Sequence, residues 1–215
     1  NNLTSDSPVA TDGGLYINDT GLKIGYLASF RISYWGGRSE TDVRPLAGVD
    51  LNLPGVTSLS DTTGRMTLSD LEDQSRVDDG LIAFTPTRPQ LVSKAAAGIT
   101  LSDVIASLKL FLGLSLPATY TSPYNYIAAD LNANGKVELS DVISLLKVFL
   151  NLPVANTQAM EWVFVDAAVG AVDNPFNLSK NSASAPLIEH DFAANSDVDL
   201  VGVIRGDVDG SWGAT

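Results

Sequence analysis

The sequence predicts an α+β protein: a β-sandwich assembled from N- and C-terminal strands, with a pair of helices inserted between them. Two observations predict this fold. Short segments rich in β-branched and aromatic residues, separated by Gly and Pro, occupy both ends of the chain, and the middle holds two helical stretches that are copies of each other. Apolar residues make up 45% of the 215 residues, which is enough for a packed core.

The N-terminal part predicts short strands. Residues 1–14 are polar and predict a lead-in without regular structure. In residues 15–89, turn signals such as Gly36-Gly37 and Pro54-Gly55 separate segments of strand composition. These predicted strands are Leu15–Asn18, Leu22–Trp35, Val49–Leu53, Met66–Leu68 and Leu81–Phe84. Repeated short strands with such punctuation are typical of a sandwich.

The middle, residues 90–153, predicts a helical insert. Thr100–Leu114 and Leu139–Leu152 have the length and composition of helices, and both contain a Ser-Asp pair that can cap a helix N-terminus. Both are apolar on more than one face. They are therefore expected to be buried on two sides, against each other and against a further part of the chain.

The remaining residues, 154–215, return to strand composition. Glu161–Asp166, Leu187–Phe192 and Val198–Arg205 predict strands. Three strands are too few to bury a core alone, so we expect them to complete the sandwich begun by residues 15–89. Two independent β domains are the alternative.

Composition and charge exclude several classes of partner. The chain has 25 acidic and 13 basic residues, a net charge of −12, which argues against a nucleic-acid or anionic-membrane surface. It has no cysteine, which excludes disulfides and thiolate metal sites. The longest apolar stretches, of about 12 residues, contain a lysine and are too short to span a bilayer, so no membrane insertion is expected.

The helical segments belong to a duplicated unit. Gly98–Leu114 and Lys136–Leu152 share 10 of 17 residues at an offset of 38. The second copy is preceded by a twelve-residue loop, Asp130–Asp141. Calcium takes six to eight oxygen ligands, and a loop of this length provides them from side chains at positions 1, 3, 5 and 12 and a carbonyl at position 7. The ligands predicted here are Asp130, Asn132, Asn134, the carbonyl of Lys136, and Asp141.

The first copy has only half of such a loop. Asp103 occupies position 12, but the residues at positions 1, 3 and 5 are Val92, Lys94 and Ala96, which offer no ligand. The missing spacing occurs near the end of the sequence, in Asp207, Asp209 and Ser211. We therefore expect a split calcium site formed by Asp103 and these three residues. The alternatives are a separate solvated turn, or a site completed by another residue or a neighbouring molecule.

Residues 98–152 resemble dockerin modules, which pair two EF-hand-type loop–helix units. The longer pattern of SPYNYIAADLNANGKVELSDVISLLKVFLNLP, EWVFVD and VDLVGVIRGDVDGSW resembles the dockerin-like C-terminal regions of large secreted bacterial repeat proteins, including calcium-dependent adhesins. The resemblance implies calcium as the bound ion and an extracellular or cell-surface location in bacteria.

The function expected is that of a structural module, such as a filament subunit or an adhesin segment, locked by calcium and capable of self-assembly. The alternative is a dockerin-type module that binds a cohesin-like protein near Leu101-Ser102 and Leu139-Ser140. We do not expect an enzyme, because the chain has a single histidine, His190, no cysteine and no Gly-x-Ser-x-Gly motif.

Overall fold

The structure is a computed structural model. It describes residues 14–18, 21–36, 44–53, 58–72, 81–91, 93–117, 122–155, 157–167, 178–185, 187–192 and 194–213. The lead-in predicted over residues 1–14 lies outside the described residues except for residue 14.

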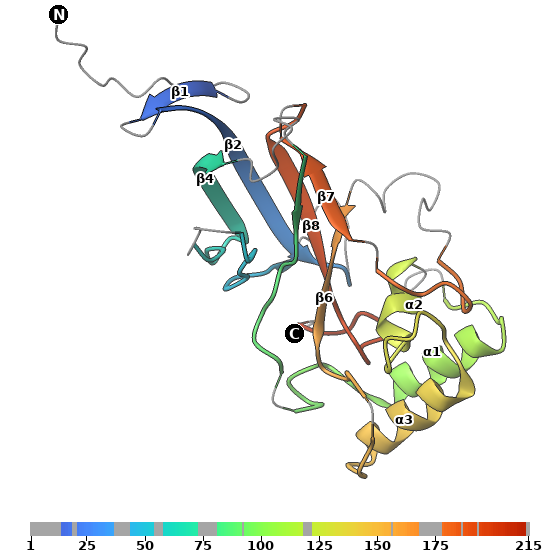
Figure 1. The fold of residues 1–215 in the computed structure, drawn as a ribbon. Coiled ribbons are helices and arrows are strands. Elements are labelled where there is room, and N and C mark those ends of the chain that lie inside the picture. The colour runs from blue at the N-terminus through green and yellow to red at the C-terminus, as the bar shows by residue number, and fades with distance from the viewer. Residues whose placement is uncertain are drawn as a thin grey trace, which may run out of the picture.

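The long strand β2 (Gly21–Tyr34) organises a six-stranded sheet. It pairs antiparallel with β1 (Gly14–Asn18), β3 (Arg44–Pro45) and β4 (Arg65–Glu72), and parallel with β8 (Asp197–Ile204). Strand β6 (Trp162–Asp166) pairs antiparallel with β8. Early and late parts of the chain therefore share one sheet, as Figure 1 shows for β2 (blue) and β8 (red).

A second sheet consists of β5 (Leu81–Phe84) and β7 (Ile188–Asp191), which pair antiparallel. The rings of Phe84 and Phe192 lie 5.8 and 5.9 Å from the ring of Phe30 in β2, within the range of favourable aromatic contact. The predicted mixture of helices with a multi-stranded sheet is therefore confirmed. The closed sandwich remains a prediction. We call the two sheets together the β framework.

The strand predicted at Val49–Leu53 is not present as a strand. Only Asp50 forms isolated β-bridges, to Leu59 and Thr87, although Val49, Leu51 and Leu53 are buried. Asn52 has a φ of 53°, in the left-handed region, and this conformation is incompatible with a continuous strand.

Three helices occur among the described residues: α1 (Leu101–Phe111), α2 (Tyr124–Ala129) and α3 (Leu139–Phe149). The predicted helices α1 and α3 end three residues earlier than expected. Gly113 and Asn151, in corresponding repeat positions, have φ of 70° and 55°. The N–H of Leu114 donates to the carbonyl oxygen of Lys109 at 2.8 Å, and the N–H of Leu152 donates to that of Lys147 at the same distance. This pattern is a Schellman motif, which terminates a helix.

Helix α2 was not predicted. It has only six residues, and its Tyr-Asn-Tyr-Ile sequence has weak intrinsic helix preference, so tertiary packing has to stabilise it. Tyr124, Ile127, Ala128 and Ala129 are all buried.

The helices lie at one end of the large sheet, next to the end of β8 (Figure 1). Helix α1 contacts α3, and α2 contacts β8. A single apolar cluster includes Val104 and Leu145 of the helices together with Ile204 and Val208 from and after β8. The helical insert therefore shares the core of the β framework. None of the helices in the described residues is both long and apolar enough to span a membrane.

Candidate metal centre

The first candidate site is the segment from the end of α2 into the first turn of α3, residues 130–141, which we call the continuous loop. Asn132 Oδ1 accepts a hydrogen bond from the N–H of Asn134 at 3.0 Å, and Asn134 Oδ1 accepts one from the N–H of Lys136 at 2.9 Å. Gly135 has a φ of 80°, the left-handed conformation that glycine adopts without strain. These local turns wind the loop back on itself and gather its polar side chains.

Asp130 and Asp141, at the two ends of the continuous loop, are both fully buried. Asp130 accepts hydrogen bonds from the N–H groups of Asn134 (3.1 Å) and Gly135 (2.9 Å). Asp141 accepts from Leu131 (3.2 Å) and Glu138 (2.8 Å). Burial raises the pKa of both carboxyls, and the charge of Asp130 adds to the rise for Asp141. The structure thus closes the predicted loop and brings two like charges together.

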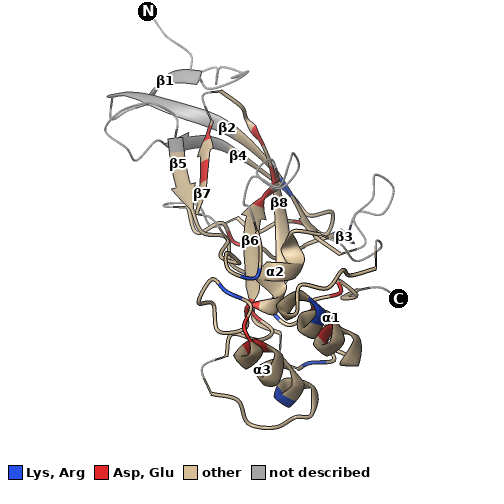
Figure 2. Cartoon of the chain, turned by 90° about the vertical axis from the view of Figure 1, so that its right-hand side faces the viewer, with Lys and Arg blue, Asp and Glu red and all other residues tan. Residues whose placement is uncertain are grey.

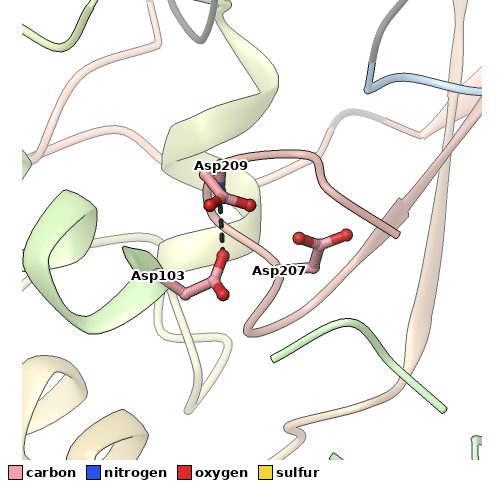
Figure 3. A group of neighbouring side chains, drawn as sticks. All are labelled: Asp103, Asp207 and Asp209. Carbon is pink, nitrogen blue, oxygen red and sulfur yellow. Dashed lines mark hydrogen bonds between the residues drawn. The ribbon is translucent and has the colours of Figure 1, made fainter. Parts of the chain in front are cut away.

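The second candidate site is the predicted split site. Figure 3 shows Asp103, from the first turn of α1, facing Asp207 and Asp209, which follow β8. One carboxylate oxygen from each of these three residues lies within 4.8 Å of the others. The N–H of Asp209 also donates to Asp103 Oδ1 at 3.0 Å. The structure therefore brings together acidic residues that are far apart in the sequence.

The segment 207–212 repeats the backbone pattern of residues 130–135. The N–H groups of Ser211 and Trp212 donate to Asp207 Oδ1 (3.0 Å) and Oδ2 (2.9 Å), just as the N–H groups at positions 5 and 6 of the continuous loop donate to its first aspartate. The N–H of Ser211 donates to Asp209 Oδ1 at 3.0 Å, as the N–H of Asn134 donates to Asn132 Oδ1 in the continuous loop. Gly210 at position 4 has a φ of 71°, close to the 57° of Ala133. The first half of the twelve-position loop pattern is thus present.

The second half comes from residues 98–103. Thr100 N–H donates to Asp103 Oδ2 at 2.7 Å, in the same way as Glu138 N–H donates to Asp141 Oδ2. Gly98 corresponds to Lys136 at the repeat offset of 38, so its carbonyl is at position 7. Ser211 Oγ lies 3.4 Å from that carbonyl. Gly98 is a candidate ligand that the sequence reasoning missed, although the offset alone could have indicated it.

In the split site, positions 6 and 7 of the loop pattern, Trp212 and Gly98, come from two segments that are far apart in the sequence. A Cβ added to Gly98 would lie only 3.0 Å from the Cα of Trp212, and Gly98 has a φ of 73°. Only glycine allows this close approach without strain. The two halves of the loop are therefore joined by packing where the continuous loop has a peptide bond.

The electrostatics of the split site favour a cation. Asp103 and Asp207 are completely buried and Asp209 is 8% exposed. In the described part of the chain, no basic side chain lies within ion-pair distance of these three carboxyls. Burial, with the charge of Asp209, raises the pKa of Asp103 to about 6, and burial with the charge of Asp103 raises the pKa of Asp207 well above its usual value. Buried like charges are costly unless protons or a cation neutralise them, and these three residues could hold a metal ion.

Comparison of the chain with protein-family models, with curated proteins and with solved structures gives no match. The function is therefore inferred from the geometry of the two loops and from the sequence pattern.

Proposed function

We propose that this chain is an extracellular, calcium-binding structural module in which calcium fastens the helical insert to the β framework. One observation carries the proposal: the split site takes Asp103 from α1 and Asp207 and Asp209 from the segment after β8. An ion bound there would be held by both parts of the fold. A filament subunit or an adhesin segment fits this design, because such proteins need mechanical connection more than catalysis.

The donor set supports calcium as the ion. The continuous loop offers carboxylate, amide and carbonyl oxygens, and the split site offers carboxylate, hydroxyl and carbonyl oxygens. All are ligands of hard cations, at the spacing of a twelve-position calcium loop. Magnesium demands a small, nearly ideal octahedral arrangement and retains water, so it suits a loop of this size less well. The resemblance to dockerin modules of secreted bacterial proteins agrees with calcium and with an extracellular location.

Calcium bound to the folded state alone stabilises the fold by mass action. Each site would add about 2.7 kcal/mol at a hundredfold excess of calcium over the dissociation constant. Much of the stability would then depend on the ion, as expected for a protein that folds only after export.

The test is isothermal titration calorimetry of calcium into the metal-stripped chain, together with thermal unfolding in calcium and in chelator. We expect two bound ions and a melting temperature that falls on chelation. No binding, or an unchanged melting temperature, would contradict the proposal.

A second candidate function, docking of a cohesin-like protein through the helices, is favoured by an apolar surface. Figure 2 shows few charged residues on α1 and α3. Ten aliphatic side chains on or just after these helices are between 38% and 56% exposed. They form five pairs at the repeat offset: Leu101 and Leu139, Ile105 and Ile143, Leu108 and Leu146, Leu112 and Leu150, and Leu114 and Leu152.

The spacing of these side chains suits a protein partner. In each helix the first four follow one another at intervals of four, three and four residues, the spacing of an apolar seam that packs against another helix or surface. Large contiguous apolar patches are uncommon on isolated proteins. Size-exclusion chromatography and electron microscopy with and without calcium distinguish the two functions: calcium-dependent polymers support self-assembly, and a calcium-dependent monomer supports docking of another protein.

A further inference from the structure

Asp207 and Asp130, the aspartates at position 1 of the two sites, contact different side chains of the β framework. Asp207 Oδ2 accepts hydrogen bonds from the N–H of Trp212 and from the hydroxyl of Tyr34 in β2. The equivalent oxygen of Asp130 accepts from the N–H of Gly135 and lies 3.8 Å from Nη1 of Arg205, which directly follows β8. The same oxygen of the same loop position thus faces a hydroxyl in one site and a guanidinium in the other.

Arg205 is fixed in this place. Its side chain is almost completely buried, and Nη1 donates to the carbonyl oxygens of Asp130 and Ile127. The backbone N–H of Arg205 donates to the carbonyl of Glu161 at 3.0 Å, which extends the pairing of β8 with β6. A buried arginine remains charged because its pKa is so high. Arg205 therefore places a permanent positive charge beside Asp130.

Tyr34 orients Asp207 without adding charge. The side chain is completely buried, and its ring lies 5.0 Å from that of Trp212. Burial and the charge of Asp207 raise the pKa of Tyr34 well above its usual value, so the phenol stays neutral. A ligand held by an outer hydrogen bond of this kind is pre-oriented for metal.

We propose that Tyr34 and Arg205 make the two calcium sites unequal, so that the split site binds calcium more tightly and fills first; this inference rests on the proposed function. The split site offers three carboxylates, Asp103, Asp207 and Asp209, and no basic side chain among the described residues lies within ion-pair distance of them. Arg44 contacts the same segment through the carbonyls of Gly210 and Trp212. The predicted ligands of the continuous loop include two carboxylates, Asp130 and Asp141, and Arg205 partly neutralises the first of them.

The affinity of calcium loops rises with ligand charge and with rigidity. Ligand charge favours the split site, and the hydrogen bond from Tyr34 orients Asp207 for the ion, so we expect the dissociation constant of this site to be lower by about tenfold or more. As the calcium concentration rises, an ion would therefore first join α1 to the β framework, and the continuous loop would bind its ion afterwards.

The inference is tested by titrating calcium into the metal-stripped full chain. We expect two resolved binding steps. Asp207→Asn should remove the tighter step, and Arg205→Gln should tighten the weaker step several-fold while leaving the tighter one unchanged. The matched control is Arg31→Gln, which removes an exposed arginine paired with Asp199 and should change neither step. Loss of the weaker step in Asp207→Asn, or an unchanged weaker step in Arg205→Gln, would overturn the inference.

A measurement on the unaltered chain guards against variants that do not fold. Trp212 contributes its N–H to the split site, so terbium bound there should show tryptophan-sensitised luminescence. We expect this emission to saturate at the first equivalent of terbium. Emission that develops only with the second equivalent would show that the continuous loop fills first and would overturn the ranking. Absence of any calcium binding would instead contradict the proposed function.

Discussion

Asp103 Oδ1 accepts a hydrogen bond from the N–H of Asp209 at 3.0 Å, although 106 residues separate the two in the sequence. The other oxygen of Asp103 accepts from the N–H of Thr100 and caps the start of α1. One carboxylate therefore both begins a helix and attaches it to the segment after β8. Asp141 has the same double role in the continuous loop, through Leu131 and Glu138.

Asp103→Asn should change stability in opposite directions with and without calcium. In excess calcium the variant should lose one bound ion and, at a hundredfold excess, about 2.7 kcal/mol of unfolding free energy. Without calcium it should gain stability at neutral pH, on the order of 1 kcal/mol, because a buried charge beside Asp209 is removed. Urea unfolding in calcium and in chelator measures both. The control, Asp197→Asn on an exposed strand residue, should change neither; a shift of one sign in both conditions would contradict the site.

Gly98→Ala should cost more stability than Gly113→Ala. Both glycines have φ near 70°, so alanine at either position is strained by about 1 kcal/mol. A Cβ at Gly113 meets no atom within 4 Å, whereas one at Gly98 would press on the backbone of Trp212 and displace the position-7 carbonyl. Chemical unfolding of both variants in calcium checks this. Equal losses would mean that the junction between Gly98 and Trp212 is not tightly closed.

The candidate ligand residues could be predicted from the sequence, because a twelve-position loop places its ligands at fixed local spacing. Asp130 to Asp141 carry a complete loop pattern, and the offset between repeats identified Asp103 as half of another. The spacing of Asp207, Asp209 and Ser211 then supplied the missing half, and the structure places these residues together.

The contacts of Tyr34 with Asp207 and of Arg205 with Asp130 could not be predicted, because they depend on how distant elements pack. Arg205 is only the last residue of a predicted strand in the sequence; its burial follows from β8 running against α2, where Gly206 N–H donates to the carbonyl of Ala128 at 2.7 Å. Tyr34 has the pattern of an ordinary core residue of β2. The parallel register of β2 with β8 is set by the shared core and has no local signal in either strand.

The calcium-free protein should lose the stabilisation from Asp103 as the pH rises from about 4 to about 6. The pKa of Asp103 is about 6 in the folded protein against an ordinary value of 3.8, so the folded state binds the proton more readily in this window. That contribution is complete below the lower value and is lost above the higher one. Thermal unfolding of the metal-stripped chain and of Asp103→Asn between pH 4 and 7.5 tests this: the difference between them should shift in favour of Asp103→Asn with rising pH. A constant difference would exclude the shifted carboxyl.

His190 should titrate above 6.5. Its Nδ1 lies 3.6 Å from Asp166 Oδ2, and its Nε2 lies 3.0 Å from the carbonyl oxygen of Asn195. The hydrogen bond to Asp166 raises the pKa of His190 against the opposing effect of burial. Because Asp166 ends β6 and His190 is in β7, the protonated ring links the two sheets. The stability gained is complete below pH 6.5 and is lost as the pH rises through the folded-state pKa.

Proton NMR measures this directly, because the chain has a single histidine and therefore one set of imidazole signals. Asp166→Asn removes the charge that favours the imidazolium and should lower the pKa of His190. Asp197→Asn, which alters a carboxyl in a different strand, should leave the pKa unchanged. A signal that titrates at or below 6.5 in the unaltered protein, or that Asp166→Asn does not move, would show that this ion pair does not connect the sheets in solution.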